Sequence, residues 1–290
     1  MGKSSVLFGI IAFFICFNGN VLSIHSEASS SEMQVHFIDV GQGDSMLIKT
    51  PGNKNILIDG GPPDAGKKVV SYLNEKKIDK IDLLVATHPD VDHIGGLPYI
   101  MKHIKVKKIL DSGKLHTTRM YAKYIQEIRK QEIPVKVAKQ NEKILLDPAV
   151  DIQVLNTYKK SRSNNQSSIA LKMSYEAMDI LFMSDVEIEQ EKEIMKNVDV
   201  DAEVIKVGHH GSNTSTSLKF LKAVSPDTAI LTYSKDNDYG HPVDRVINNL
   251  YRVNANIYST GALGNLVIRT DGEDYLVLPE REPLYDLDAS

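Results

Sequence analysis

The stretch Thr-His-Pro-Asp-Val-Asp-His at residues 87–93 carries most of the structural information in this chain. It follows an apolar run at residues 81–86 that predicts a buried strand, and Ile-Gly-Gly comes directly after it. One turn thus holds four side chains that can bind a metal: His88, Asp90, Asp92 and His93. Because such a turn has little reason to exist unless a cation orders it, we interpret it as part of a site for two cations about 3.5–4 Å apart, as in two-metal hydrolytic sites.

Composition places the chain among ordinary soluble globular proteins. Its 290 residues suit one large domain or two small ones. A net charge of −4 gives no global basic field that would attract nucleic acid or anionic lipid. This balance argues against a purely electrostatic DNA-binding protein, but not against an enzyme that acts on DNA.

Residues 1–32 have the pattern of a bacterial-type signal peptide followed by a short polar leader, because Lys3 precedes an apolar run, Val6 to Phe17, that is short for a membrane span. An uncleaved N-terminal anchor is the alternative. We expect a secreted or cell-surface protein with one domain at residues 33–280 and an acidic tail at 281–290. The single cysteine, Cys16, lies in the leader, so the mature chain would have no disulfide, cysteine nucleophile or thiolate metal ligand.

Strand-like and helix-like segments alternate along the domain, which indicates an α/β protein with sheets covered by helices. Short apolar runs bounded by turn residues predict the strands. Amphipathic or charged segments predict helices at residues 64–76, 97–103, 118–130, 187–196, 216–223 and 243–253.

Further metal-binding side chains follow later strands. Asp185 comes directly after an apolar strand ending at Met183, and we expect its carboxylate to bridge both cations. His209 and His210 lie on a glycine-flanked turn after another strand; a flexible loop holding two surface histidines is the alternative. His241 opens a helix and would face a substrate phosphate or carbonyl, unless it only caps that helix.

Two aspartates near the start of the domain suit a supporting role behind the metal ligands. Asp59 ends a strand and precedes Gly60-Gly61, where its carboxylate could orient a ligand by accepting hydrogen bonds; a turn aspartate is the alternative. Asp44 lies in the glycine-rich loop 39–45 and is a second candidate. That loop is not a phosphate-binding P-loop, because no Gly-Lys-Ser/Thr follows it.

These motifs, in this order, resemble the metallo-β-lactamase fold hydrolases, and within them the soluble nuclease-like domain of the ComEC competence proteins. The resemblance covers about residues 33 to 280 and rests on the segments Phe37–Ser45, Leu57–Gly61, His88–Gly96, Ser184-Asp185, His209–Ser212, Gly240–Pro242 and Ser259–Gly261. It implies a four-layer αββα sandwich with the metals at one edge of two packed sheets.

The resemblance also implies the role of each site residue. Asp185 would bridge the cations, His209 would be the last ligand with His210 as its alternative, and Asp59 would support the ligands from behind. His241 would touch the substrate. The ligands of the first motif would be His88, Asp90, Asp92 and His93.

The chain departs from the wider superfamily at two points that bear on the metal. Asp90 stands where a histidine is usual, and residues 163–168 contain no histidine where another ligand is expected, so Asn165 or Ser167 could contribute only oxygen. A carboxylate-rich site favours a harder ion, so Mn²⁺ or Mg²⁺ competes with Zn²⁺. We therefore expect one or two divalent cations, with a weaker first site.

From these residues and the resemblance we expect a secreted metal-dependent hydrolase, a phosphodiesterase or DNase in which a metal-bound hydroxide attacks phosphorus. Asp92 would accept a proton as well as bind metal, and His241 would donate a hydrogen bond to the phosphoryl group or leaving group. One alternative is a hydrolase of another ester, a lactone or a phosphorylcholine-type substrate on the same fold. Another is a non-catalytic metal-binding protein.

Lysines and arginines between residues 102 and 130 could follow a phosphate backbone, although a solvated charged face is the better-supported interpretation. The chain has no tryptophan, and its tyrosines and phenylalanines are not interleaved with these lysines. The sequence therefore does not indicate stacking on single strands. It indicates no protein partner.

Overall fold

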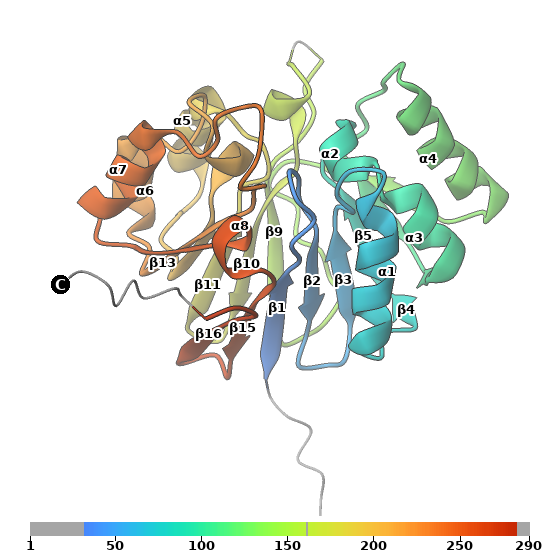
Figure 1. Cartoon of the computed structure of the whole chain (residues 1–290), viewed down its shortest axis with the longest axis horizontal. Coiled ribbons are helices and arrows are strands. Elements are labelled where there is room, and N and C mark those ends of the chain that lie inside the picture. The colour runs from blue at the N-terminus through green and yellow to red at the C-terminus, as the bar shows by residue number, and fades with distance from the viewer. Residues whose placement is uncertain (1–31, 161, 283–290) are drawn as a thin grey trace, which may run out of the picture. The chain divides into compact units, whose positions relative to one another are not determined.

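The computed structural model describes residues 32–160 and 162–282, where strands and helices alternate as the sequence indicates (Figure 1). The expected signal peptide and most of the acidic tail lie outside the described residues. In the part of the chain that is described, no helix combines the length and the apolar character needed to cross a bilayer.

The first sheet has eight strands and joins an antiparallel half to a parallel half. The first strand of the chain pairs with one strand from its end, which pairs in turn with the last strand, and the other side of the sheet continues through parallel neighbours. In spatial order the strands are β16 (Tyr275–Pro279), β15 (Leu266–Thr270), β1 (Met33–Phe37), β2 (Met46–Lys49), β3 (Asn55–Ile58), β5 (Leu83–Ala86), β7 (Ile109–Asp111) and β8 (Val135–Val137).

The second sheet has six strands, of which four run parallel to one another. In spatial order they are β14 (Asn256–Ser259), β13 (Thr228–Leu231), β12 (Val204–Lys206), β11 (Met178–Phe182), β10 (Ala170–Tyr175) and β9 (Asp151–Asn156). A separate two-stranded ribbon pairs β4 (Lys80–Ile81) with β6 (Lys105–Val106).

The six helices predicted from the sequence are all present, with small shifts at their ends. The helix expected at 216–223 begins at Leu218, because the Ser217 hydroxyl caps it by accepting from the Phe220 N–H. The helices are α1 (Ala65–Glu75), α2 (Val91–Ile94), α3 (Leu97–His103), α4 (Arg119–Lys130), α5 (Ile188–Asn197), α6 (Leu218–Val224), α7 (Asp244–Arg252) and α8 (Thr260–Leu263).

Successive side chains of a strand point to opposite faces of its sheet, so the buried side chains divide among three hydrophobic cores. In β2, Met46 and Ile48 belong to the core between the sheets, whereas Leu47 points the other way into a core shared with α1, α3 and α4. A third core lies between the second sheet and α5, α6 and α7. Three cores separate four layers, so the αββα sandwich implied by the resemblance is confirmed (Figure 1).

Parallel strands place the loops at their carboxyl ends along one edge of each sheet, where open α/β sheets bind their ligands. The loops that follow β3 and β5 lie on the edge of the first sheet. Those that follow β11, β12 and β13 lie on the edge of the second. These five loops carry the residues of the metal centre described next.

Candidate metal centre

The turn after β5 presents its polar side chains from a short, well-defined piece of backbone. Asp90 is extended and begins α2, whose single turn carries Asp92 and His93 side by side. The backbone N–H of His93 donates to the Asp90 carbonyl at 3.1 Å. His88 and His93 are buried, while the side chains of Asp90 and Asp92 remain about one-third exposed toward a cleft.

Asp59, at the end of β3, holds this turn from behind. Its carboxylate accepts from the backbone N–H of Thr87 at 2.9 Å and from the Thr87 hydroxyl at 2.6 Å. The same carboxylate accepts from His93 Nδ1 at 2.8 Å. Because a carboxylate only accepts, the His93 proton resides on Nδ1 and the Nε2 lone pair faces the centre.

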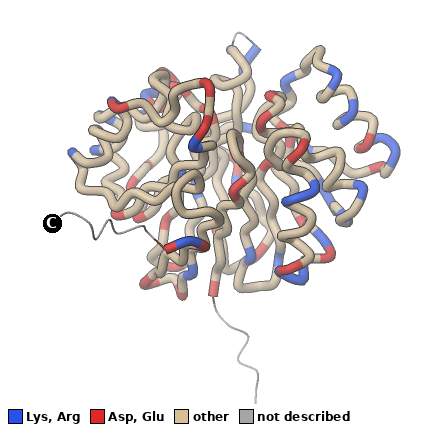
Figure 2. Tube along the Cα trace, in the orientation of Figure 1, with Lys and Arg blue, Asp and Glu red and all other residues tan. Residues whose placement is uncertain are grey.

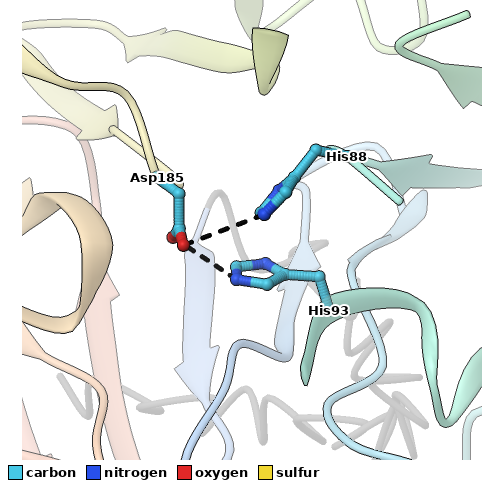
Figure 3. Close-up of side chains that lie close together, drawn as sticks. All are labelled: His88, His93 and Asp185. Carbon is cyan, nitrogen blue, oxygen red and sulfur yellow. Dashed lines mark ion pairs between the residues drawn. The ribbon is translucent and has the colours of Figure 1, made fainter. Parts of the chain in front are cut away.

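Asp185 follows β11 of the second sheet and lies opposite the turn that follows β5 of the first sheet. Its two carboxylate oxygens face different histidines. Oδ1 lies 3.3 Å from His93 Nε2, and Oδ2 lies 3.8 Å from His88 Nε2 (Figure 3). The side chain is almost fully buried. This is the arrangement needed for a carboxylate that bridges two cations.

The turn after β12 aims two adjacent histidines at opposite oxygens of Asp185. His209 and His210 both adopt left-handed backbone conformations, with φ of 49° and 53°. His209 Nε2 lies 3.5 Å from Asp185 Oδ2, and His210 Nε2 lies 3.8 Å from Asp185 Oδ1. His210 donates from Nδ1 to the Thr232 carbonyl at 2.8 Å, which leaves its Nε2 lone pair toward the centre.

Two ligand sets therefore share Asp185. The His93 set consists of Asp92, His93 and His210 around Oδ1; the His88 set consists of His88, Asp90 and His209 around Oδ2. The sequence left His209 and His210 as alternatives, and the structure brings in both, one to each set.

Nitrogen–oxygen separations within the two sets run from 3.3 to 3.8 Å. Such separations are long for hydrogen bonds but match donors around one ion, because ligand atoms bonded at roughly 2.1 Å are about 3.4 Å apart along a tetrahedron edge. Asp92, His93 and His210 can place three ligand atoms within 4.8 Å of one another, and so can His88, His93 and Asp185, a group that joins the two sets.

Several buried polar atoms at this point have no hydrogen-bond partner among the described residues. They are His88 Nε2, His93 Nε2, His210 Nε2 and Asp185 Oδ1. An unpartnered buried polar atom is costly, and convergence of three such imidazole nitrogens on the carboxylate of Asp185, whose own Oδ1 is also unpartnered, is hard to explain by protein contacts alone. Divalent cations would supply a partner for each of these atoms. The side chains at this point therefore suit the divalent metal that the resemblance implies.

Charge interactions among these groups outweigh the effect of burial. Burial raises the pKa of Asp185 and of Asp92, but the neighbouring histidines lower both more strongly. Burial lowers the pKa of His93, yet Asp185 and Asp92 bring it well above its usual value. A cation that binds here displaces those protons, because ligating imidazoles must be neutral.

A buried ion pair that the sequence did not single out supports His210. Lys206, at the end of β12, is fully buried and its Nζ lies 2.5 Å from Asp44 Oδ2. The other oxygen of Asp44 accepts from the Thr232 hydroxyl at 2.5 Å and lies 3.5 Å from His210 Nδ1. The signal was present in the sequence, since a lysine interrupts an otherwise apolar strand.

The centre opens into a cleft of about 310 Å³ that is lined by Asp90, Asp92, Asp185 and several histidines. Asn165 lies in this wall, with its amide 3.3 Å from His209 Nε2, whereas the buried Ser167 hydroxyl donates to the Ser163 carbonyl and does not reach the centre. His241 is also in the wall, with its ring 5.6 Å from that of His209. Its Nδ1 is buried and has no hydrogen-bond partner within residues 32–160 and 162–282.

Comparison with known proteins agrees with this architecture. A family model described as the metallo-β-lactamase superfamily matches residues 38–234. ComE operon protein 3 of Bacillus subtilis (strain 168) is 34% identical over 260 residues, which cover 83% of this chain and 33% of that protein. Recombination protein 2 of Haemophilus influenzae is 26% identical over 265 residues, covering 89% of this chain and 31% of that protein. The chain thus spans about a third of the length of these relatives.

Solved structures support the same fold. The metallo-β-lactamase fold protein YhfI of Bacillus subtilis aligns with a TM-score of 0.56 at 13% identity, over 82% of this chain and 99% of that chain. At this identity the likeness concerns the fold alone. The sequence motifs and the sandwich thus point to one superfamily, and the relatives carry ComEC-family names, as the resemblance indicated.

Proposed function

The chain belongs to the metallo-β-lactamase superfamily, and from this premise we propose that it is a metal-dependent hydrolase of phosphodiester bonds in nucleic acid. One observation carries the proposal. The two oxygens of the buried Asp185 face two separate sets of imidazole and carboxylate ligands, one around His93 and one around His88.

The charge of the cleft explains why an anionic substrate would need the cations. Its lining includes three carboxylates, Asp90, Asp92 and Asp185, and no lysine or arginine among the described residues. A phosphodiester would be repelled by these carboxylates alone. Divalent cations neutralise them, act as Lewis acids toward a phosphoryl oxygen and lower the pKa of a bound water.

The cations would divide between the sets. Asp92, His93 and His210 would hold one, and His88, Asp90 and His209 the other, with Asp185 bridging. In this assignment His209 supplies the imidazole that the sequence lacks at residues 163–168. The ligands of the His88 set include the partly exposed carboxylate of Asp90, which keeps Mn²⁺ a competitor of Zn²⁺.

Two side chains in the wall of the cleft would act on the substrate directly. Asp92 is partly exposed beside the ligands, where it can accept a proton from the attacking water as well as hold a cation. Burial lowers the pKa of His241, so its ring is neutral at neutral pH and offers one N–H. That N–H would donate to a phosphoryl oxygen or to the leaving group.

Nucleic acid is supported by two further observations. The relatives include proteins named for recombination and for the ComE operon. A groove of about 420 Å³ between α3 and α4 is lined by Lys102, Lys123 and Lys130, and basic residues line α4 (Figure 2). These lysines would follow a phosphate backbone outside the cleft.

We also propose that the enzyme acts outside the cytoplasm, on the basis of the leader expected in residues 1–32. N-terminal sequencing of protein recovered from the growth medium tests this. Recovery of a chain that starts near residue 33 is the expected result, and retention of the intact chain in the cells contradicts it.

A metal and substrate panel tests the function. The purified protein is analysed for metals and assayed with single-stranded oligonucleotide, plasmid DNA, bis-p-nitrophenyl phosphate, a phosphorylcholine ester and a β-lactam, with Mn²⁺, Zn²⁺ or EDTA. We expect metal-dependent cleavage of DNA and of the model diester. Turnover of the phosphorylcholine ester or the lactam alone would assign a different hydrolase, and bound metal without any turnover would indicate a binding protein.

A further inference from the structure

A tyrosine at the mouth of the cleft is unusually exposed. The Tyr239 side chain is 70% accessible although its ring is large and mostly apolar. It lines the same cleft as the metal centre. Its ring is stacked on that of His241, with centroids 5.7 Å apart and planes 24° apart. His241 therefore contacts the Tyr239 ring with a lateral offset, and most of the ring remains accessible.

The loop that carries both rings is tied together by one side chain. The Asn237 amide donates to the carbonyls of Ser234 and His241, at 2.7 and 2.6 Å. Its oxygen accepts from the backbone N–H groups of Tyr239 and His241, at 3.1 and 3.0 Å. Gly240 between the rings has a φ of 68°, a conformation that glycine adopts without strain. A flat surface fixed in advance binds a planar group with little loss of conformational entropy.

The position of this surface relates it to the reaction. His241 lies 5.6 Å from His209 and 5.7 Å from Tyr239, ring centre to ring centre, so Tyr239 lies within about 11 Å of a proposed metal ligand. A phosphodiester at the cations would thus have its neighbouring base within reach of Tyr239. The lining of the cleft adds Val91, which is 49% exposed, as a second apolar contact.

We propose that Tyr239, backed by His241, is a stacking subsite for the nucleobase next to the scissile phosphate. The inference deepens the proposed function and rests on it. A base in a duplex already stacks on both faces, so it must leave the helix before it can lie on Tyr239. The substrate is therefore an unpaired nucleotide in a single strand or at a strand end. The sequence alone did not indicate a stacking role for Tyr239, because this residue is distant along the chain from the lysines of α4.

The absence of tryptophan from the sequence permits a direct binding test. Tyr239→Trp contains a single tryptophan, and phosphorothioate linkages in the test strands resist hydrolysis during the titration. Titration with an oligothymidylate in the presence of Mn²⁺ should quench its fluorescence saturably, and an abasic deoxyribose-phosphate oligomer of equal length should not. The matched control is Tyr251→Trp, because Tyr251 is 64% exposed on α7 but does not line the cleft. It should show no quenching.

A kinetic test uses the active enzyme. Tyr239→Ala should raise KM for a single-stranded oligonucleotide about tenfold, which corresponds to about 1.4 kcal/mol, and change kcat much less. KM for the abasic oligomer should not change. Tyr239→Phe, which keeps the ring, should restore the affinity.

The outcomes separate this inference from the proposed function. Cleavage of the oligonucleotide with no difference between normal and abasic strands would overturn the stacking subsite alone. So would equal quenching in the Tyr251→Trp and Tyr239→Trp variants, or an equal loss of kcat on both strands in Tyr239→Ala. Absence of both binding and cleavage for every strand would overturn the proposed function, and this inference with it.

Discussion

The two ligand sets that share Asp185 differ in how their histidines are held. In the His93 set, His93 donates to a carboxylate and His210 donates to a backbone carbonyl. In the His88 set, His88 and His209 each have a threonine hydroxyl 3.1 Å from Nδ1. A carboxylate or carbonyl only accepts and fixes the tautomer. The Thr87 hydroxyl gives its proton to Asp59 and therefore also accepts from His88 Nδ1, whereas the Thr214 hydroxyl can donate or accept and leaves the tautomer of His209 open.

This difference indicates which cation is held more firmly. The His93 set has its lone pairs directed at the centre in advance, and the Lys206–Asp44 pair packs behind it. In the His88 set, His209 must select its tautomer when the cation arrives, and its side chain is 20% exposed. We therefore expect tight binding at the His93 set and exchangeable binding at the His88 set.

Removal of Asp185, the ligand that both sets share, should abolish the difference in cation affinity between the His93 set and the His88 set. In Asp185→Ala both sets lose an oxygen, so we expect loss of both cations and a fall in kcat/KM of about 10³-fold or more. Metal analysis and the diester assay measure these effects. Asp179→Ala is the control, because Asp179 lies on the same strand, β11, and pairs with Lys172 away from the centre. Retained turnover in Asp185→Ala would contradict the bridging role.

Removal of the support behind His210 should weaken the fold. Lys206→Met leaves Asp44 buried without its cationic partner, and breaking a buried pair in this way costs about 3–5 kcal/mol. Urea unfolding measures it, and Lys222→Met on the exposed side of α6 serves as control. The double variant Lys206→Met/Asp44→Asn should recover much of the loss. A single variant as stable as the wild type would show that the pair contributes nothing.

Substitution of the adjacent histidines should separate the two sets. His210→Ala should weaken the more tightly bound cation about 10- to 100-fold, since even supporting residues of metal sites have effects of that size. His209→Ala should leave that cation bound and weaken the other, with activity restored by excess Mn²⁺. Calorimetric titration of the metal-free variants resolves the two events. Equal effects of both substitutions would refute the asymmetry.

A decrease in pH should lower the free energy of unfolding as well as weaken metal binding, and His36 allows these two effects to be distinguished. Burial lowers the pKa of His36, which accepts or donates a hydrogen bond with the Tyr72 hydroxyl, to about 4. Below an unfolded pKa near 6.5 the unfolded chain binds a proton that the native chain does not, so stability falls as pH decreases toward 4. We expect a loss of about 1 kcal/mol between roughly pH 7 and pH 5.5.

His36→Gln should remove this part of the pH dependence while leaving metal binding unchanged, because His36 lies on β1 and does not line the cleft. Urea unfolding at both pH values provides the measurement. An unchanged pH dependence in the variant would show that His36 is not the source.

Local sequence was sufficient for the six longer helices and for most strands, but it did not predict β7 or the one-turn helices α2 and α8. The resemblance supplied the four-layer arrangement. Strand ends marked by His, Asp and Gly predicted the loops of the centre, because parallel strands bring those loops to one edge. The assignment of His209 and His210 to opposite sides of Asp185 could not be predicted, since it depends on consecutive left-handed residues in one turn. The packing of Lys206 against Asp44 joins residues far apart in the sequence and has no local signature beyond a lysine in an apolar strand. The exposure of Tyr239 depends on how Asn237 folds its loop.

The proposed ligands come from both sheets of the sandwich: His88 to His93 follow a strand of the first, and Asp185, His209 and His210 follow strands of the second. Two bound cations would therefore link the first sheet to the second. A ligand that binds only the assembled protein stabilises the assembled form. A chain divided between β8 and β9 would yield two fragments whose reassociation reports metal concentration. Because the proposed ligands are divided between the two sheets, such a pair of fragments would serve as a split sensor for divalent cations.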